Sequence, residues 1–435
     1  ILCCAGGKTG DFVLPETVTT IGDSAFQWCD KLNSITMSEG VTRIGMYAFY
    51  GCDSLERVYM PSSVTNIGER AFAFCKNLKE VQLPNNISNI SYDMFSNSGL
   101  ETIYIPDNVT SIDDFAFSSC YNLSSVDMPE HLTVIGYGAF SHCTSLTEID
   151  IPFGVESINN SAFANCDNLK YVTIPSSVTN IGRTPFSGCD SLVKIDVDRA
   201  NQNYSSYDGI LFNKAGTELI SYPGGKGSTY DIPSHVTSIG YGAFYGSDNL
   251  RSVSMSDNVT NIGVSAFGSC SGLMQVELSD NITVINNSVF SGCDSLRSIV
   301  LPDGITHIYY DAFSSCDNLI SISLPDGVIY IGDNVFQWCS SLKNISIPDG
   351  VSSIGVHTFS NCSSLTNVSI PSSVTEIGYG AFSNCNGLKD VYYNGSEEQW
   401  NYISIDAHNE CLTSAVIHLN ENESTPTPPP ENKPS

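Results

Sequence analysis

Positive charge is scarce in this 435-residue sequence, which has 18 Lys and Arg against 46 Asp and Glu and a formal net charge of −28. Because clustered cations are needed to hold a phosphate backbone, this balance argues against a nucleic-acid partner and against an anionic membrane surface. Long apolar runs are also missing, so no segment of the chain is expected to span a membrane. The acidic composition predicts a solvated surface with strong self-repulsion.

Motifs for catalysis and cofactor binding are equally scarce. The seven histidines stand in no zinc-protease or nucleophile-elbow pattern, and no phosphate-binding glycine loop occurs. No short Cys or His spacing predicts zinc. His142 beside Cys143 resembles a dyad in sequence, but adjacent residues on a turn point apart. We therefore expect no enzyme, no cofactor and no metal site.

What the sequence does have is a phenylalanine that returns about every 23 residues. A fixed period of 20–50 residues indicates stacked repeats, each touching only its neighbours, and this overrides the domain count that length alone would give. The series is Phe26, Phe49, Phe72, Phe95, Phe117, Phe140, Phe163 and Phe186, then Phe244, Phe267, Phe290, Phe313, Phe336, Phe359 and Phe382.

One unit, residues 172–194, shows how a repeat is built. Val172 and Ile174 are apolar with Thr173 between them, which predicts a short strand with one buried face. Pro175 ends that strand, because proline cannot donate to a sheet ladder, and turn-forming residues follow it. A second extended piece then leads to Ala-Phe-x-x-Cys or a variant of it, for which we expect a short helical or 3₁₀ turn.

The position after the second extended piece is Gly in ten of fifteen clear units, and otherwise Asp113, Asn159, Asn286, Ser91 or Tyr309. Gly, Asn and Asp are the residues that best tolerate positive φ. We therefore expect a left-handed corner at this position in every repeat.

The recurring Leu-x-x-Ile-x-Ile-Pro and Val-Thr-x-Ile-Gly-x-x-Ala-Phe-x-x-Cys resemble the BspA-like leucine-rich repeat family of bacterial surface and secreted proteins, over roughly residues 12–393. The common Asn ladder of other leucine-rich repeats is absent, and proline takes the strand corner instead. The resemblance implies a leucine-rich-repeat solenoid, β-rich within the α/β class. This would be a parallel β-sheet superhelix with short helical or 3₁₀ turns and about sixteen rungs.

Two breaks in the repeat divide the chain. Repeat four is one residue short near Gly99, and the gap between Phe186 and Phe244 contains two apolar runs around a glycine loop, which predict a β-hairpin. This insert is either a spacer between repeat blocks or a ligand-facing bump. The expected organisation is an N-terminal remnant at 1–11, repeat block one at 12–194, a long variant repeat with the hairpin at 195–229, repeat block two at 230–390, a C-terminal cap at 391–419 and a Pro-rich linker or tail at 420–435.

The two ends of the sequence differ from the repeats, and each permits a prediction. The chain begins Ile1-Leu2-Cys3-Cys4, either after removal of a signal or at a fragment boundary, and Cys3 or Cys4 is a weak candidate for lipid attachment. At the other end, the cap should shield the last open core layer. The residues expected to do this are Trp400, Ile403, Ile405, Leu412 and Ile417.

Sixteen cysteines in a presumed extracellular chain would ordinarily predict disulfides. Thirteen of them, however, occupy one repeat position and would form a line inside the stack. We expect these to be free, buried thiols, because side chains in register lie parallel, although Cα spacing between rungs would admit bridges. The turn residues Asp303, Asp326 and Asp349 recur at the same spacing. They are either solvated or bound to Ca²⁺, and the loops lack the ligand run of a dedicated calcium site.

The strand residue between the two inward apolar positions should face outward, and stacking should align these residues into a binding strip. Tyrosine and acidic side chains gather in the first half of this strip, and tyrosine is enriched in protein interfaces. Together with the residues just before the strands, the candidate binding surface is Arg57, Tyr59, Tyr104, Asp127, Asp150, Tyr171 and Asp196.

The resemblance implies a non-enzymatic adhesion protein, extracellular or on the cell surface, that presents its solenoid surface to host matrix proteins or to other cells. The expected partner is a protein or glycan, and we expect a monomer. The alternative is a structural scaffold or spacer that displays a downstream domain beyond the Pro-rich segment.

Overall fold

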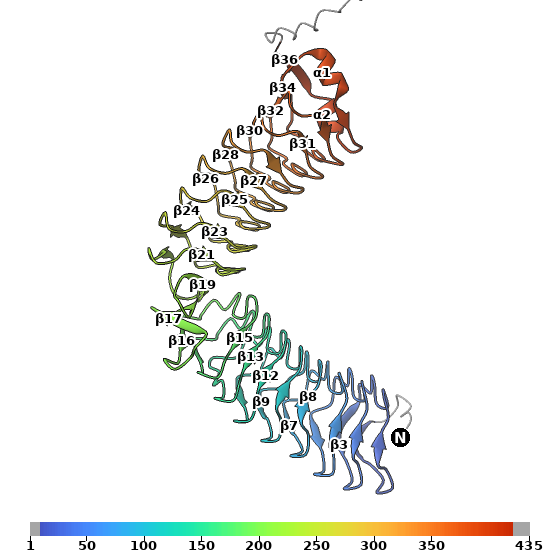
Figure 1. Cartoon of the computed structure of the whole chain (residues 1–435). Coiled ribbons are helices and arrows are strands. Elements are labelled where there is room, and N and C mark those ends of the chain that lie inside the picture. Colours follow the sequence, from blue (N-terminus) through green and yellow to red (C-terminus); the bar gives the residue numbers. More distant parts are fainter. Residues whose placement is uncertain (1–8, 421–435) are drawn as a thin grey trace, which may run out of the picture. The chain divides into compact units, whose positions relative to one another are not determined.

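The computed structural model describes residues 9–420, so the expectations for Cys3, Cys4 and most of the Pro-rich segment fall outside the described residues. The described backbone is a parallel β-solenoid of about 18 turns, close to the sixteen rungs expected (Figure 1). It divides into two compact units. One comprises residues up to Arg251 together with Ser265–Gly272, and the other comprises Ser252–Val264 and residues from Leu273 onward.

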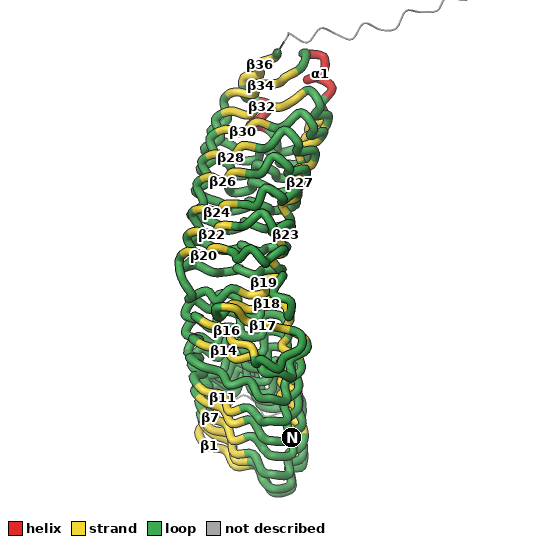
Figure 2. The backbone as a smooth tube through the Cα atoms, turned by 60° about the vertical axis from the view of Figure 1, so that its left-hand side comes forward, coloured by secondary structure: helices red, strands yellow, loops and turns green. Residues whose placement is uncertain are grey.

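In the first unit, short parallel strands alternate between two faces of each rung (Figure 2). The face that carries the predicted strip holds β1 (Gly10–Val13), β3 (Leu32–Thr36), β5 (Arg57–Tyr59), β7 (Glu80–Gln82), β9 (Thr102–Tyr104), β11 (Ser125–Asp127), β14 (Tyr171–Ile174), β16 (Lys194–Val197) and β20 (Thr229–Asp231). The other face holds β2 (Thr20–Ile21), β4 (Arg43–Ile44), β6 (Asn66–Ile67), β8 (Asn89–Ile90), β10 (Ser111–Ile112), β12 (Val134–Ile135), β13 (Ser157–Ile158), β15 (Asn180–Ile181) and β21 (Ser238–Ile239). The insert adds β17 (Tyr204–Tyr207), β18 (Ile210–Asn213) and β19 (Glu218–Ser221).

The second unit repeats this arrangement and ends in a cap with two short helices. The strip face holds β22 (Ser252–Ser254), β24 (Gln275–Glu277), β26 (Ser298–Val300), β28 (Ser321–Ser323), β30 (Asn344–Ser346), β32 (Asn367–Pro371), β34 (Asp390–Asn394) and β36 (Val416–Leu419). The other face holds β23 (Asn261–Ile262), β25 (Val284–Ile285), β27 (His307–Ile308), β29 (Tyr330–Ile331), β31 (Ser353–Ile354), β33 (Glu376–Ile377) and β35 (Ser404–Ile405). The helices are α1 (Glu397–Tyr402) and α2 (Glu410–Thr413).

The phenylalanine ladder, meaning the Phe series named above, forms the centre of the core. Its side chains are almost completely buried, and neighbouring rings lie nearly parallel. The ring centroids of Phe140 and Phe163 are 5.4 Å apart with planes 3° apart, and those of Phe26 and Phe49 are 5.1 Å apart. Each ring therefore makes its main aromatic contacts with the rungs directly before and after it.

The segment around each phenylalanine is a series of hydrogen-bonded turns and contains no helix. Its backbone N–H groups donate to carbonyls of the following rung, as in Ser24 to Met46, Phe26 to Ala48 and Trp28 to Tyr50, at 2.7–2.8 Å. We call this repeated set of bonds the turn ladder. Because it needs two left-handed residues per turn, positive φ recurs on both sides of Ala-Phe, for example at Ser24 and Trp28.

The prediction of a left-handed corner at the glycine that recurs in the repeats is wrong. Gly45 and Gly68 do not have positive φ, and the left-handed residues lie two positions further along, at Tyr47 and Arg70. The glycines are there because the previous turn is too close: a Cβ at Gly45 would lie 2.5 Å from the Asp23 nitrogen, and one at Gly68 would lie 2.6 Å from the Met46 nitrogen. Close backbone approach, and not a special φ, explains the glycine.

The line of thirteen cysteines is buried, and all thirteen are free thiols, as expected. A typical member donates its thiol hydrogen to the carbonyl of the phenylalanine one rung earlier. The Sγ–O distance is 3.0 Å from Cys52 to Phe26 and 3.1 Å from Cys166 to Phe140. Two rungs carry buried serines, Ser98 and Ser247, at the same position.

The insert contains the hairpin that its sequence predicts, because β18 pairs antiparallel with β19, and β17 also pairs antiparallel with β18. The structure adds a feature that the sequence pattern hides. Tyr222, which is 3% exposed, donates its backbone N–H to Ala243 as a ladder phenylalanine does, and its ring lies 5.0 Å from Phe244. Tyr222 therefore takes the ladder position of the variant repeat.

The C-terminal cap ends the turn ladder by supplying acceptors. Gly380 donates to the Ala407 carbonyl, and Phe382 donates to Oδ1 of Asn409 at 2.9 Å. Asn409 is 3% exposed, and its Nδ2 donates to the carbonyls of Gly378 and Asp406. Of the residues expected to shield the core, Leu412 and Ile403 are buried, while Trp400 contacts the buried Tyr393 ring at 5.2 Å.

Replacing this amide should loosen the cap. We expect Asn409→Ala to lower the free energy of unfolding by about 1–3 kcal/mol, because it removes the acceptor of the Phe382 N–H and one of the two donors to the Gly378 carbonyl, which keeps its bond from Ala381. Urea unfolding followed by circular dichroism measures the change. Asn409→Asp, which keeps the acceptor but loses both donors, should fall between wild type and alanine. The exposed Asn401→Ala serves as the control, and an equal loss in that variant would contradict the assignment.

Candidate binding surface

The outward strand positions form the strip that the sequence predicts. In β5, β7 and β9 the central residue is buried and both neighbours are exposed. Tyr59, Tyr104 and Tyr171 are 52%, 53% and 58% exposed. Parallel pairing holds them in register with polar residues of adjacent rungs, with Tyr59 opposite Gln82 and Tyr104 opposite Asp127. The three tyrosine rings are thus exposed to solvent on hydrogen-bonded parallel strands.

Two of the predicted residues, Arg57 and Tyr59, line a first hollow of about 630 Å³ on this face. Its other walls carry charges of both signs, from Lys79, Glu80 and Glu101. Lys79 and Glu101 form an ion pair with a nitrogen–oxygen distance of 2.9 Å across adjacent rungs, and both side chains are more than half exposed. The first hollow is therefore polar, with Tyr59 as its aromatic wall.

Three more predicted residues, Tyr104, Asp127 and Asp150, line a second hollow of about 780 Å³. Sequence reasoning missed two other members, Asp107 and Phe153, the latter 68% exposed. Asp107 lies 3.5 Å from the Tyr104 hydroxyl, and its negative charge raises the pKa of Tyr104. The sequence signal for Phe153 is an aromatic residue in a Pro-x-Gly turn where other repeats carry Asp.

The second hollow has an electrostatic character of its own. Asp107, Asp127, Glu130 and Asp150 line it, and no Lys or Arg is among its described lining residues, although His131 is. Carboxylates around an exposed tyrosine ring favour a cation, which gains both ion pairing and contact with the ring face. The remaining predicted residues, Tyr171 and Asp196, line neither hollow, and Asp196 pairs with Lys194 at 2.6 Å.

The structure separates the residues that resembled a catalytic dyad. The Cys143 thiol donates inward to the Phe117 carbonyl at 3.2 Å, while the exposed His142 ring contacts Asn165. Burial raises the pKa of the Cys143 thiol well above its usual range, which disfavours the nucleophilic thiolate. Within residues 9–420, no group of three or more His, Cys, Asp or Glu side chains could hold a metal ion, and no helix is long and apolar enough to cross a membrane.

Comparison with known proteins agrees with this geometry. The family model described as "BspA type Leucine rich repeat region (6 copies)" matches residues 3–124, 110–225, 221–340 and 306–425. No curated protein sequence matches the chain. A leucine rich cell surface protein from Faecalibacterium prausnitzii is 32% identical, with 92% of this chain and 91% of that chain covered and a TM-score of 0.56.

Two further solved structures are similar over most of their length. A leucine-rich repeat protein from Bacteroides ovatus is 28% identical over 94% of this chain and 92% of that chain, with a TM-score of 0.48. The pneumococcal vaccine antigen PcpA is 20% identical over 97% of this chain and 91% of that chain, with a TM-score of 0.49. Given the family match along nearly the whole sequence, this chain belongs to the BspA-type leucine-rich repeat proteins.

Proposed function

We propose that this protein is a non-enzymatic binding protein of the cell surface or extracellular space, and that its ligand is a protein held on the strand strip. The observation that carries the proposal is the second hollow, where exposed Tyr104 and Phe153 stand among four carboxylates. The proposed contact surface is the predicted set, Arg57, Tyr59, Tyr104, Asp127, Asp150, Tyr171 and Asp196. The name of the Faecalibacterium relative, a cell surface protein, supports the location.

The chemistry of the second hollow favours a ligand segment that presents Lys or Arg. Asp127 and Asp150 lie on successive rungs and supply acceptors, while Tyr104 supplies a ring face for the same cation. The net charge of −28 attracts a basic partner over longer range and speeds encounter at low salt. Binding should therefore weaken as ionic strength rises, because exposed charge pairs are screened within about 10 Å at 0.1 M salt.

Surface plasmon resonance against immobilised fibronectin, fibrinogen and collagen tests the proposal. We expect the wild type to bind at least one of them, and the triple variant Tyr59→Ser, Tyr104→Ser, Tyr171→Ser to bind it at least about tenfold more weakly, since exposed aromatic anchors dominate interface energies. The control replaces Tyr121, Tyr310 and Tyr379, which are 53%, 43% and 44% exposed and lie off the strip.

Equal affinity in the triple variant and the wild type would refute the strip as the recognition surface. Binding to none of these proteins would instead favour the scaffold function, in which the solenoid positions a neighbouring part of the protein. Circular dichroism spectra of both triple variants confirm that any loss arises from the surface and not from unfolding.

A further inference from the structure

A third hollow, of about 460 Å³, lies in the first unit among residues of the phenylalanine turns, away from the strand strip. We call it the turn hollow. Tyr137 and Phe115 line one part of it, and Tyr241 and Tyr245 line another. Tyr137, Tyr241 and Tyr245 are 41%, 39% and 39% exposed. Its volume falls within the range of about 300–1,000 Å³ that is usual for small-molecule sites.

The variant repeat creates this hollow. The stretch before Tyr222 is short: Leu219 pairs with Ile239, but Tyr222 follows Leu219 by three residues where Phe244 follows Ile239 by five. The turn of Gly242 therefore approaches the one before the insert, and a Cβ at Gly242 would collide with the Thr184 side chain. The Arg183 guanidinium carbon lies 4.5 Å from the centre of the Tyr241 ring, which holds that ring in place. Thr184 and Gly242 are 58 positions apart in sequence, and their contact brings two pairs of aromatic side chains, Phe115 with Tyr137 and Tyr241 with Tyr245, to one site.

The lining between these aromatic walls consists of small polar groups. Ser141, Ser161, Thr184 and Ser187 supply hydroxyls, and Asn165 supplies an amide. The Ser161 and Thr184 hydroxyl oxygens are 3.2 Å apart, and Asn165 Nδ2 lies 3.3 Å from His142 Nε2. Hydroxyl groups can both donate and accept hydrogen bonds, so the same lining can pair with a ligand that carries hydroxyls.

The turn hollow carries no carboxylate, although the chain as a whole has a net charge of −28. Among its described lining residues there is also no Lys or Arg, and apart from the tyrosine hydroxyls only His142 is ionisable. Arg183, which contacts the Tyr241 ring, is a cation beside the hollow, but the described lining itself supplies no Lys, Arg or carboxylate to pair with a charged peptide or phosphate ligand. A neutral ligand with apolar faces and many hydroxyls fits both the rings and the polar lining.

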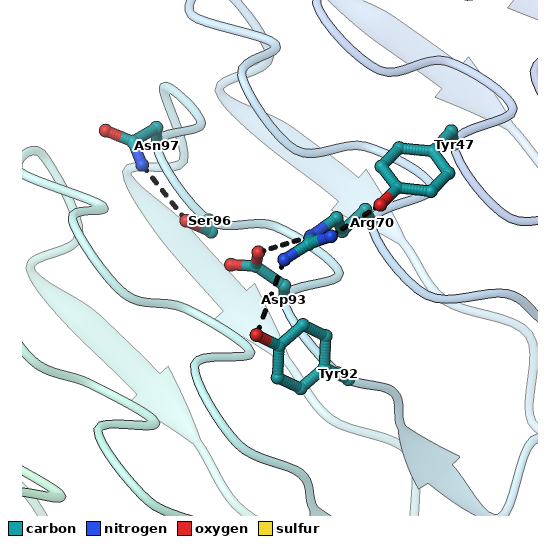
Figure 3. A network of polar contacts seen from close by, with 6 residues as sticks. All are labelled: Tyr47, Arg70, Tyr92, Asp93, Ser96 and Asn97. Atoms are coloured by element: carbon teal, nitrogen blue, oxygen red, sulfur yellow. Dashed lines mark hydrogen bonds and ion pairs between the residues drawn. The ribbon is translucent and has the colours of Figure 1, made fainter.

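Aromatic side chains continue from the hollow along the same turns. Tyr137 contacts Phe115 with centroids 4.8 Å apart, and Phe115 contacts Tyr92 at 6.0 Å. Arg70 then lies between Tyr92 and Tyr47, donates to both of their hydroxyls and is fixed by an ion pair to Asp93 at 2.7 Å (Figure 3). Parallel rungs repeat at roughly 4.8 Å, which is close to the length of one pyranose residue.

We propose that the turn hollow is a carbohydrate-binding site that takes a neutral, linear, β-linked oligosaccharide. The apolar C–H faces of its pyranose rings lie against Tyr137, Tyr241 and Tyr245, and its hydroxyls pair with the serines and with Asn165. The chain of sugar residues extends from the hollow over the aromatic turns toward Tyr92. This site is separate from the strand strip and does not depend on the protein ligand proposed above.

Isothermal titration calorimetry with cellohexaose and with chitohexaose tests the site, with maltohexaose as the α-linked comparison. We expect at least one β-linked hexaose to bind with a dissociation constant on the order of 10 µM to 1 mM. The double variant Tyr137→Ala, Tyr241→Ala should weaken that binding by at least about tenfold, because two stacking faces are lost. Asn165→Ala should weaken it by about threefold to tenfold.

Two controls keep the result specific. Tyr121→Ala removes a tyrosine of similar exposure outside the turn hollow and should leave hexaose affinity unchanged. The triple strip variant at Tyr59, Tyr104 and Tyr171 should also keep it, so failure of the protein-binding proposal and failure of this one are distinguishable. The proposal would be overturned if neither β-linked hexaose binds with a dissociation constant below about 10 mM, or if the wild type and the double variant bind with equal affinity. A matrix protein whose binding requires Tyr137 and Tyr241 would also overturn it.

Discussion

Raising the pH from 8 to about 10.5 is expected to unfold the protein in a steep transition, because its core contains a line of ionisable thiols. Burial raises the pKa of the thiols of Cys120, Cys270, Cys316 and Cys385 from an ordinary 9.0 to about 12. Burial raises the pKa of five others well above 9.0, namely Cys75, Cys143, Cys166, Cys339 and Cys362.

The direction of the effect follows from proton linkage. The folded pKa of each thiol lies above its unfolded value, so the folded state binds more protons once the pH exceeds about 9. Stability is therefore fully present below pH 9 and is lost between pH 9 and 12. In this window each thiol lowers the free energy of unfolding by about 1.4 kcal/mol per pH unit. These nine thiols together therefore lower it by an amount on the order of 10 kcal/mol by pH 10. That loss is comparable with the total stability of an ordinary domain, about 5–15 kcal/mol.

Circular dichroism as a function of pH measures the transition, and the chain offers its own control. Serine occupies the cysteine position at Ser98 and Ser247, and it does not ionise in this range. The variant Cys120→Ser, Cys143→Ser, Cys166→Ser should therefore move the alkaline midpoint upward by roughly 0.4 pH units. An unchanged midpoint would show that other groups, such as the buried Tyr222 with its pKa raised to about 12, control the transition.

Phe140→Ala is expected to lower the free energy of unfolding by about 3–5 kcal/mol, because it opens a cavity in a fully buried layer. It also removes ring contacts on both sides, to Phe117 at 5.2 Å and to Phe163 at 5.4 Å. Since each rung contacts only its neighbours, the cavity should weaken coupling between the rungs before and after it. We therefore expect a lower urea midpoint and a less cooperative transition.

Urea titration monitored by circular dichroism gives both quantities for three matched variants. Phe140→Leu keeps most of the volume and should lose less than half as much stability as alanine. Tyr222→Phe restores the residue type of the other ladder positions and should change stability by less than about 1.5 kcal/mol. A loss below about 1 kcal/mol for Phe140→Ala would mean that the ring stack is not the main support of the core.

The repeat pattern predicted the phenylalanine ladder, the buried free cysteines and the outward strip because all three depend on position within the 23-residue period. The left-handed residues could not be predicted in the same way. Positive φ occurs at Trp28, Tyr47, Arg70 and Phe115, which are poor choices by intrinsic preference. The hydrogen bonds of the turn ladder impose this conformation, and a preference-based interpretation placed it at the glycine instead.

The features that sequence reasoning missed arise where the period fails. Asn409 lies beyond the last repeat, so nothing in the pattern indicates that its amide accepts from Phe382. Tyr222 lies 36 residues after Phe186, and its ladder role appears only in its backbone bond to Ala243. The turn hollow depends on the contact between the turns of Thr184 and Gly242. This contact depends on how the chain folds through the insert, and the 23-residue period does not extend through the insert.

The turn ladder has an electrical direction of its own, although other bonds between the rungs, such as Thr42 to Thr19 and Gly45 to Ile21, run the opposite way. Its bonds run one way, from the N–H groups of one turn to the carbonyls of the next, as in Phe290 to Ala312 and Phe313 to Val335. Peptide dipoles aligned in this manner add up as they do in a helix, but here the positive end points toward the C-terminus. The cap that receives this end is acidic, with Glu397, Glu398 and Glu410 in the first turns of its helices. The carboxylates of the cap thus lie at the end of the chain toward which the positive pole of the turn ladder points.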